Sequence, residues 1–400
     1  MPVEMSPQKL LLVLPLLAYR SENQIFVDAQ ARNGLRLWLD NFDVLTLACP
    51  TSDGAPPVGY LPIVDNRVTF VALPVAYTPL RFAAALYKTA PILRKIIAEA
   101  DFLHFAIGGL FGDWGSASAI MAFRNDRPFA VWTDRVESQI AAFQAKSKSG
   151  LKKVYYVAVA ALMKIYERRI IRMSTLGLFH GMECYEAYCP YSSNPQLVHN
   201  IHLGREHQIT DTEIAARLEH RGPVRIAYAG RVDRDKGVFD WIDALSCAAK
   251  ENIDFSAVWF GDGPEIDNAR GRVVTKNLAD RVEFPGATSH LALIERLRSF
   301  DLFMFCHQTQ ESPRCLVEAL ICGLPLVGYE TPYPRDLIKK HGGGILSPFR
   351  RPELLPGSIR KFCERRIEIT RNARLDGELY DAEGVFQHRS DLMKASLRGI

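Results

Sequence analysis

The sequence lacks the cysteine spacing of a metal site or a disulfide framework. Its eight cysteines form no Cys-x-x-Cys pair, and several lie within apolar runs. Such cysteines are typical of reduced core residues in a cytosolic protein, which excludes the disulfide-stapled and zinc-ribbon classes. The sequence also lacks a strong excess of one charge, since 49 Lys and Arg face 45 Asp and Glu. A net charge of +4 gives no reason to expect a nucleic-acid partner.

Long hydrophobic runs are absent as well. No run approaches the ~20 apolar residues that a membrane span needs. The N-terminal stretch MPVEMSPQKLLLVLPLLAYR has only a short apolar run, with an acid before it and no small-residue cleavage site after it. We therefore expect this stretch to be the first strand of a parallel sheet rather than a signal peptide.

The length and the apolar pattern predict two α/β domains. Four hundred residues are enough for two domains with separate cores. Apolar segments of strand length recur, with helical spacing between most of them, as in residues 23–42. Because these segments are continuous rather than alternating, we expect strands buried on both faces, in parallel sheets covered by helices. The segments are 10–15, 43–50, 68–74, 102–107, 129–133, 176–181, 225–230, 256–261, 282–286, 302–306, 324–329 and 343–347.

The domain boundaries follow from changes in composition. Residues 204–223 are charged and contain few large apolar residues, so we place the crossing between domains there. The predicted domains are residues 1–204 and 205–375, and we expect a C-terminal helix within residues 376–400 that packs back on the first domain.

Polar side chains at the carboxyl ends of strands are the candidate site residues, because ligands of parallel sheets bind there. In the first half this rule selects His104, Asp134, Arg135 and His180. A structural role, in capping or pairing, stays open for each of them.

In the second half, the stretch 307–329, HQTQESPRCLVEALICGLPLVGY, reads as strand end, loop, helix, turn and strand. Ser312 can cap the helix, with Pro313 in its first turn, and Gly323 ends it. Glu311 lies just outside the helix start, where free N–H groups suit an anion, and Glu318 lies about two turns inside.

Two further motifs follow predicted strands of the second half. The loop after residues 225–230 carries two cations, Arg231 and Lys236, and WFGDGPEID places Gly261-x-Gly263 between a strand and a helix. A dinucleotide fingerprint needs a third glycine at position 266, but this residue is Ile, which argues against an NAD enzyme.

Together these motifs resemble those of the family-4 retaining glycosyltransferases, which have the GT-B fold of two Rossmann-like α/β/α domains facing across a cleft. The resemblance implies that Arg231 and Lys236 hold the donor diphosphate, and that Glu318 contacts the ribose hydroxyls. An acid at the helix start contacts the donor sugar in the family, whose two glutamates are usually one residue further apart than Glu311 and Glu318. Gln310 and Glu311 therefore both stay candidates for that role. The remaining donor-binding residues implied by the resemblance are Gly230, Gly261, Gly263, Ser312, Arg314, Cys315 and Leu316.

The resemblance implies a retaining, hexosyl-type glycosyltransferase. It would move a sugar from a nucleoside diphosphate to a hydroxyl of a saccharide or lipid-linked acceptor, in surface polysaccharide or glycoconjugate synthesis, and the first domain would bind the acceptor. We expect no cofactor and no metal, because three nearby cations would repel a metal from the Asp-x-Asp at Asp233 and Asp235. Two alternatives stay open: a GT-B nucleotide-sugar epimerase, and a catalytically degenerate assembly partner.

Residues 146–172 combine a basic and an apolar character. Lysines precede an apolar decamer, and Lys164, Arg168, Arg169 and Arg172 follow it. One interpretation is a basic amphipathic surface that rests on anionic lipid, which would place a cytoplasmic protein peripherally at the inner membrane face. The other is a helix that packs on the sheet and exposes a basic face to solvent. The unbroken apolar run favours the second.

Overall fold

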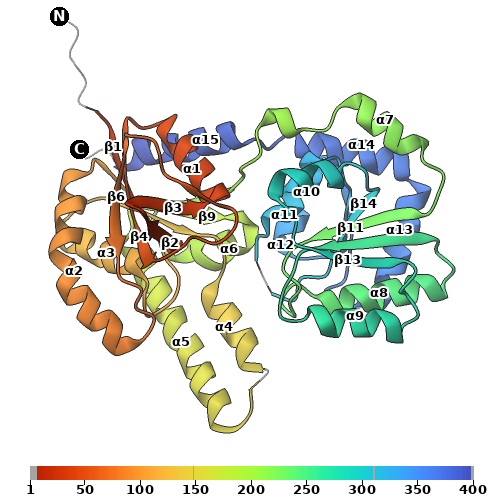
Figure 1. The fold of residues 1–400 in the computed structure, drawn as a ribbon, viewed down its shortest axis with the longest axis horizontal. Helices are drawn as coiled ribbons and strands as arrows, with labels where there is room; N and C mark the ends of the chain where they lie inside the picture. Colours follow the sequence, from red (N-terminus) through yellow and green to blue (C-terminus); the bar gives the residue numbers. More distant parts are fainter. Residues whose placement is uncertain (1–6, 147, 310, 398–400) are drawn as a thin grey trace, which may run out of the picture. The chain divides into compact units, whose positions relative to one another are not determined.

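The structure, a computed structural model, describes residues 7–146, 148–309 and 311–397. It consists of two compact units: unit 1 contains the chain up to His202 and from Glu383 onward, and unit 2 contains Leu203–Ala382 (Figure 1). The chain leaves unit 2 later than the predicted position 375. The reason is that α14 (Arg366–Gly377) continues past this point and packs on other helices of unit 2.

Unit 1 is built on a sheet of strand order β10-β9-β8-β7-β1-β4-β2-β3-β5, with β6 also paired to β4. The pairs from β10 to β4 are parallel, and β3 pairs antiparallel with β2 and β5. The strands are β1 Lys9–Val13, β2 Ala18–Ser21, β3 Gln24–Asp28, β4 Val44–Asp53, β5 Tyr60–Pro62, β6 Val68–Leu73, β7 Phe102–Ala106, β8 Ala130–Thr133, β9 Leu176–His180 and β10 Pro195–Val198. The helices are α1 Ala29–Leu39, α2 Pro79–Glu99, α3 Trp114–Arg124, α4 Glu137–Lys146, α5 Gly150–Met173, α6 Gly181–Tyr188 and α15 Ala382–Leu397, of which the last crosses back from unit 2.

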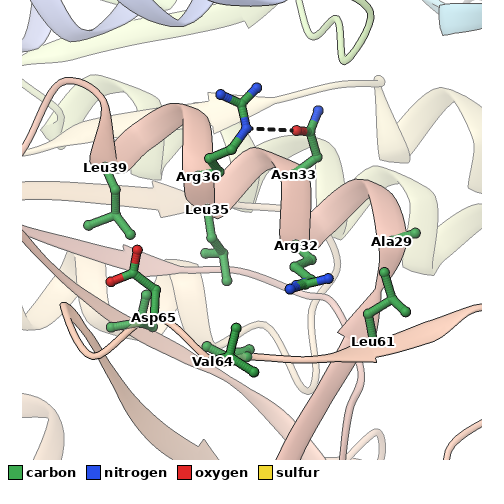
Figure 2. A pocket seen from close by; sticks show the side chains of 11 residues that line it. Ala29, Arg32, Asn33, Leu35, Arg36, Leu39, Leu61, Val64 and Asp65 are labelled. Carbon is green, nitrogen blue, oxygen red and sulfur yellow. Dashed lines mark hydrogen bonds between the residues drawn. The ribbon is translucent and has the colours of Figure 1, made fainter.

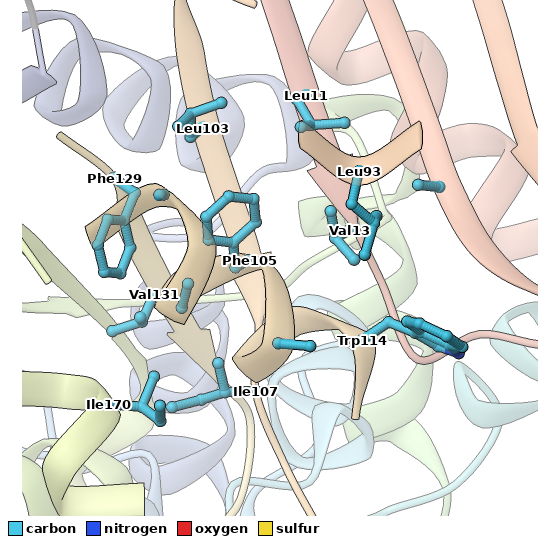
Figure 3. Packing of buried hydrophobic residues seen from close by; sticks show 14 of the residues in the cluster. Leu11, Val13, Leu93, Leu103, Phe105, Ile107, Trp114, Phe129, Val131 and Ile170 are labelled. Carbon is cyan, nitrogen blue, oxygen red and sulfur yellow. The ribbon is translucent and has the colours of Figure 1, made fainter. Parts of the chain in front are cut away.

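The core of unit 1 lies between the sheet and the helices on one of its faces. Figure 3 shows strand side chains of β1, β7 and β8 facing side chains of the covering helices. The labelled members include Leu11, Val13, Phe105 and Val131 from strands, and Leu93, Trp114 and Ile170 from helices. Continuous burial of these strands is what the apolar runs predicted, because a strand covered on both faces favours apolar side chains along its whole length.

The prediction of one helix over residues 23–42 is wrong in its first part. Glu22 and Asn23 adopt positive φ angles of 48° and 62°, which turn the chain tightly between β2 and β3. The helix begins only at Ala29, where the Asp28 side chain accepts a hydrogen bond from the Ala31 N–H.

Unit 2 contains a six-stranded parallel sheet of order β13-β12-β11-β14-β15-β16. The strands are β11 Val224–Ala229, β12 Phe255–Phe260, β13 Val282–Gly286, β14 Leu302–Phe305, β15 Leu326–Tyr329 and β16 Gly344–Ser347. The helices are α7 Asp211–Glu219, α8 Val238–Lys250, α9 Ile266–Thr275, α10 His290–Leu297, α11 Arg314–Ile321, α12 Pro332–Leu337, α13 Leu355–Glu364 and α14 Arg366–Gly377.

The stretch 204–223, predicted as a linker, contains a helix. α7 begins at a capping box in which the Thr210 and Glu213 side chains each accept a hydrogen bond from the other residue's backbone N–H. The sequence did not indicate this helix because α7 has almost no apolar face. Of its residues, only Ile214 and Arg217 are buried.

Helix α5 is not the core helix that the apolar run in residues 146–172 favoured. The buried residues of α5 are Ala160, Glu167, Ile170 and Ile171, so mainly the last third of the helix packs on unit 1. Most of the apolar decamer is exposed to solvent.

All eight cysteines are free thiols. Among the residues described, no helix is both long enough and apolar enough to cross a bilayer.

Candidate functional site

The strand order of unit 2 reverses between β11 and β14. From β11 the chain proceeds outward to β12 and β13, and from β14 it proceeds in the opposite direction to β15 and β16. At such a switch point the loops that leave the carboxyl ends of the two strands diverge, which makes room for a ligand. Arg231 and Lys236 lie in the loop after β11, and Glu311 lies in the loop after β14.

Lys236 and Glu311 are direct neighbours at this point. The Lys236 Nζ donates hydrogen bonds to both carboxylate oxygens of Glu311, at 2.7 Å each. The two side chains are only 21% and 13% exposed, which strengthens their attraction. Lys236, which is predicted to hold the donor diphosphate, thus contacts Glu311. Glu311 is one of the two candidates for the residue that contacts the donor sugar. The other candidate, Gln310, lies outside the described residues.

The rest of the loop after β11 is held by its own charges. The Asp233 carboxylate accepts from the Arg231 Nη2 at 2.7 Å and from the Asp235 N–H at 3.0 Å. Arg234 pairs with Glu265, at the start of α9, at 2.6 Å. Burial, together with the neighbouring carboxylates of Asp233 and Glu311, raises the pKa of Asp235. The Arg231 side chain stays 61% exposed, so it can reach an incoming anion.

Two glycines let the loops approach closely. Gly237 has a φ of 76°, and a Cβ there would lie 1.8 Å from the Cys306 carbonyl oxygen. Gly261, after β12, has a φ of 139°, and a Cβ there would lie 2.1 Å from the Gly230 carbonyl oxygen. Any side chain at these positions would push the loops of the switch point apart.

Helix α11 begins one residue later than predicted. Pro313 keeps an extended ψ of 127° and is itself the N-cap, so the prediction that Ser312 caps the helix is wrong. The buried Ser312 hydroxyl has no hydrogen-bond partner within the part of the chain that the structure describes. Arg314, Cys315 and Leu316 form the first turn of the helix, and their donor-binding role stays a prediction.

The far end of α11 is fixed by backbone geometry and by α7. Gly323 adopts a φ of 64°, its N–H bonds to the Leu320 carbonyl, and the Leu324 N–H bonds to that of Ala319, which is a Schellman motif. The Arg217 guanidinium donates to the last carbonyls, those of Cys322 and Gly323, at 2.8 and 2.6 Å. These contacts hold the helix that carries Glu318.

Sequence reasoning missed two histidines near the predicted residues. The carboxylate of Glu318, which is buried, lies 2.9 Å from the Nε2 of His290. His290 follows the carboxyl end of β13, so the strand-end rule could have found it. His307 is buried, with its Nε2 2.8 Å from the Tyr228 hydroxyl. Burial and the adjacent Lys236 keep the pKa of His307 well below its usual value, so its ring is neutral.

In unit 1 the structure removes one candidate from the strand ends. The prediction that His104 ends its strand is wrong, because β7 continues to Ala106. The His104 ring is 1% exposed and packs against Trp38, and the Arg389 Nη2 of α15 lies 3.4 Å from its Nε2. Burial, with a smaller effect from Arg389, keeps the pKa of His104 well below its ordinary value. His104 is therefore a core residue between the sheet and α15.

The other unit 1 candidates lie at strand ends. Asp134 and Arg135 follow β8 and are exposed, and Arg135 contacts Glu137 at 2.5 Å. His180 ends the neighbouring strand β9, but it is buried and stacks on Trp132 with 5.8 Å between the ring centroids. Their role toward an acceptor stays a prediction.

Unit 1 also contains a cavity of about 460 Å³ that sequence reasoning did not anticipate. It lies between α1 and the segment 61–68, with Leu35, Leu39 and Leu61 on its walls and Arg32 and Asp65 among its polar residues (Figure 2). None of the described candidate residues lines it.

Known proteins match this chain in sequence and in structure. Residues 210–376 match the model of the family described as glycosyl transferases group 1. A 2-deoxystreptamine N-acetyl-D-glucosaminyltransferase from Streptomyces fradiae is 28% identical over 128 residues, which cover 31% of this chain and 30% of that protein. The chain spans about a third of the length of the curated relatives that it matches.

Solved structures match over nearly the whole chain. The sucrose-phosphate synthase of Thermosynechococcus elongatus has a TM-score of 0.70 at 15% identity, covering 97% of this chain and 98% of that one. The Anabaena protein HepE, solved in complex with UDP, has a TM-score of 0.66 at 16% identity, covering 97% and 100%. The chain therefore has the GT-B fold of two Rossmann-like domains, and its residues 210–376 are similar to the glycosyl transferases group 1 family.

Proposed function

We propose that this protein is a retaining, hexosyl-type glycosyltransferase that moves a sugar from a nucleoside diphosphate to a hydroxyl of a saccharide or lipid-linked acceptor. Its place would be in surface polysaccharide or glycoconjugate synthesis in the cytoplasm. The observation that carries this proposal is the ion pair of Lys236 and Glu311. It joins two motifs that are 75 residues apart into one polar site at the switch point of a group 1 domain.

The charges of this site suit a departing diphosphate. When the bond between the sugar carbon and the phosphate oxygen breaks, negative charge grows on the diphosphate, and Arg231 and Lys236 stabilise it. The N–H groups at the start of α11 and the buried Ser312 hydroxyl add hydrogen-bond donors. Glu318 accepts hydrogen bonds from the ribose hydroxyls, and Glu311 from the sugar hydroxyls.

The proton of the acceptor hydroxyl needs a destination. In a retaining transfer the new bond forms on the face that the diphosphate leaves, so a phosphate oxygen lies next to the attacking hydroxyl and takes its proton. This route requires no side-chain base. Unit 1 binds the acceptor in this proposal, with Asp134 and Arg135 as its candidate contacts. For a lipid-linked acceptor the enzyme works at a membrane surface, and residues 146–172 supply the cations and apolar side chains for that contact.

We also propose that no divalent metal takes part. Asp233 already accepts from Arg231 and from the Asp235 N–H, and Lys236 adds a further cation beside this carboxylate pair. The charge of the Asp233 carboxylate is thus already matched by a cation, which leaves less negative charge to hold a metal. Activity is expected to survive exhaustive chelation. Loss on chelation, with recovery on adding manganese or magnesium, would refute metal independence.

The decisive experiment is a thermal-shift screen of the full chain against UDP, GDP, ADP and their sugars. A ligand at a hundred times its dissociation constant stabilises the folded state by about 2.7 kcal/mol. Lys236→Ala is expected to abolish the shift, whereas Lys250→Ala, at an exposed position of the same unit, is the matched control. The proposal fails if none of these nucleotides stabilises the protein. Product analysis without acceptor separates transfer from epimerisation, since an epimerase would convert the donor sugar alone.

A further inference from the structure

Helices α4 and α5 form a hairpin that extends out of unit 1. The two helices pack on each other, and Figure 1 shows α4 and the first part of α5 projecting beyond the sheet of unit 1. The base of the hairpin is anchored by Glu167, whose carboxylate accepts from the Ser138 N–H of α4 and the Tyr188 hydroxyl of α6. The tip has no such anchor among the described residues, yet it is rich in apolar side chains.

These apolar side chains form one exposed stripe along α5. Leu151, Val154, Tyr155, Leu162 and Ile165 are 89%, 66%, 64%, 55% and 66% exposed. Their spacings of three, four and seven residues place them on the same helix face. A row of this kind on a water-exposed helix marks an interaction surface rather than a chance exposure.

The same segment holds the excess positive charge of the chain. Residues 146–172 contain eight Lys or Arg and one acid, Glu167, which is buried. Their net charge of +7, set against +4 for the whole chain, leaves −3 for all other residues together. The lysines near the tip, Lys146, Lys148, Lys152 and Lys153, are exposed.

A groove beside the stripe combines the same two properties. It has a volume of about 320 Å³ and lies between α4, α5 and α6. Lys164 and Arg168 line it together with apolar residues such as Val157 and Ala161. A phosphate head group can therefore meet cations there while its chain contacts apolar walls.

We propose that the α4–α5 hairpin docks on the surface of an anionic phospholipid bilayer. The stripe enters the interface between head groups and acyl chains, and the surrounding cations contact the lipid phosphates. Charge decides against a second copy of this chain, because two hairpins of net charge +7 would repel each other. A nucleic acid would satisfy the cations but would leave the apolar stripe in water.

Sedimentation of the full chain with vesicles tests the proposal. The protein is expected to pellet with phosphatidylglycerol–phosphatidylcholine vesicles at low salt, and much less at high salt or with phosphatidylcholine alone. Each cation near an anionic surface contributes roughly a factor of five in partitioning. Changing Lys146, Lys148, Lys152 and Lys153 to Glu should therefore weaken binding by about two orders of magnitude or more. The matched control makes the same change at four exposed lysines of unit 2, Lys250, Lys339, Lys340 and Lys361, and should bind like the unmodified protein.

A second pair of variants tests the apolar stripe. Leu162→Asn with Ile165→Asn should reduce vesicle binding at least tenfold, whereas Val274→Asn with Ile367→Asn, at exposed positions of unit 2, should not. Light scattering of each variant reports its oligomeric state. The proposal is overturned if the protein fails to pellet with anionic vesicles at low salt, or if the control variants lose binding equally. It is also overturned if the stripe variant instead breaks up a dimer. The assay contains neither donor nor acceptor, so its failure leaves the proposed transferase function untouched.

Discussion

Replacement of Glu167 by Gln is expected to stabilise unit 1 at neutral to alkaline pH. Glu167 is 3% exposed, and its carboxylate accepts from two neutral donors, the Ser138 N–H at 3.1 Å and the Tyr188 hydroxyl at 3.0 Å. Burial raises the pKa of Glu167 to about 7, although the two hydrogen bonds lower it. The nearby Glu137 raises it further. Gln carries no charge, and its amide can accept from Ser138 and donate to Tyr188.

The sign of the effect follows from the two pKa values. The ordinary value of 4.5 applies to the unfolded chain, so the folded state holds the proton more tightly. The contribution of Glu167 to the free energy of unfolding therefore falls as the pH rises from about 4.5 to about 7. Below this window Glu167 does not change the free energy of unfolding, and above it the loss stays constant. At about 1.4 kcal/mol for each pH unit, ionised Glu167 costs the folded state about 3 kcal/mol at the alkaline end.

Denaturant unfolding of the full chain at a series of pH values measures this difference. The advantage of Glu167→Gln over the unmodified protein should be near zero at acidic pH and grow to about 3 kcal/mol above neutrality. Glu99→Gln, at an exposed position of α2, is the control and should show no such dependence. An advantage that is the same at all pH values, or that grows toward acidic pH, would refute the reasoning.

Three further predictions concern unit 2. Glu318→Gln should mainly weaken donor binding, whereas Arg231→Ala should lower kcat more strongly, and near-normal steady-state kinetics in either variant would remove its donor-site role. Glu311→Gln should reduce turnover, because an amide accepts weaker hydrogen bonds from a sugar and loses the ion pair with the loop after β11; unchanged turnover would exclude Glu311 as the sugar contact. Gly237→Ala should destabilise unit 2 by more than about 2 kcal/mol in denaturant unfolding, because a positive φ and a backbone clash combine. The control Gly357→Ala, in α13 with open space around its Cβ, should be neutral or slightly stabilising.

The sequence by itself determined the class of the fold and the places of most of its parallel strands. Runs such as 102–107 and 302–306 are buried strands because a strand covered on both faces must be apolar along its whole length, which is a local property. The end of α11 is also a local property. Gly323 adopts a positive φ without steric cost, and this ends the helix whatever surrounds it. Likewise Arg231 and Lys236 lie in the loop that follows β11, so their place near a strand end needed no knowledge of distant contacts.

Only the tertiary structure decided which of these residues meet and which faces are covered. Glu311 reaches Lys236 because the loops after β11 and β14 converge, and Glu318 of α11 reaches His290 at the start of α10. No local pattern records either distance. His104 and the stripe of α5 are two cases in which the sequence pattern did not predict burial. A polar residue in a strand became core because α15 covers it, and an apolar helix face stayed in water because no described element packs on it. Burial depends on the elements that surround a residue. A local sequence pattern therefore predicts that an apolar face will be covered, but it does not say which element or molecule covers it.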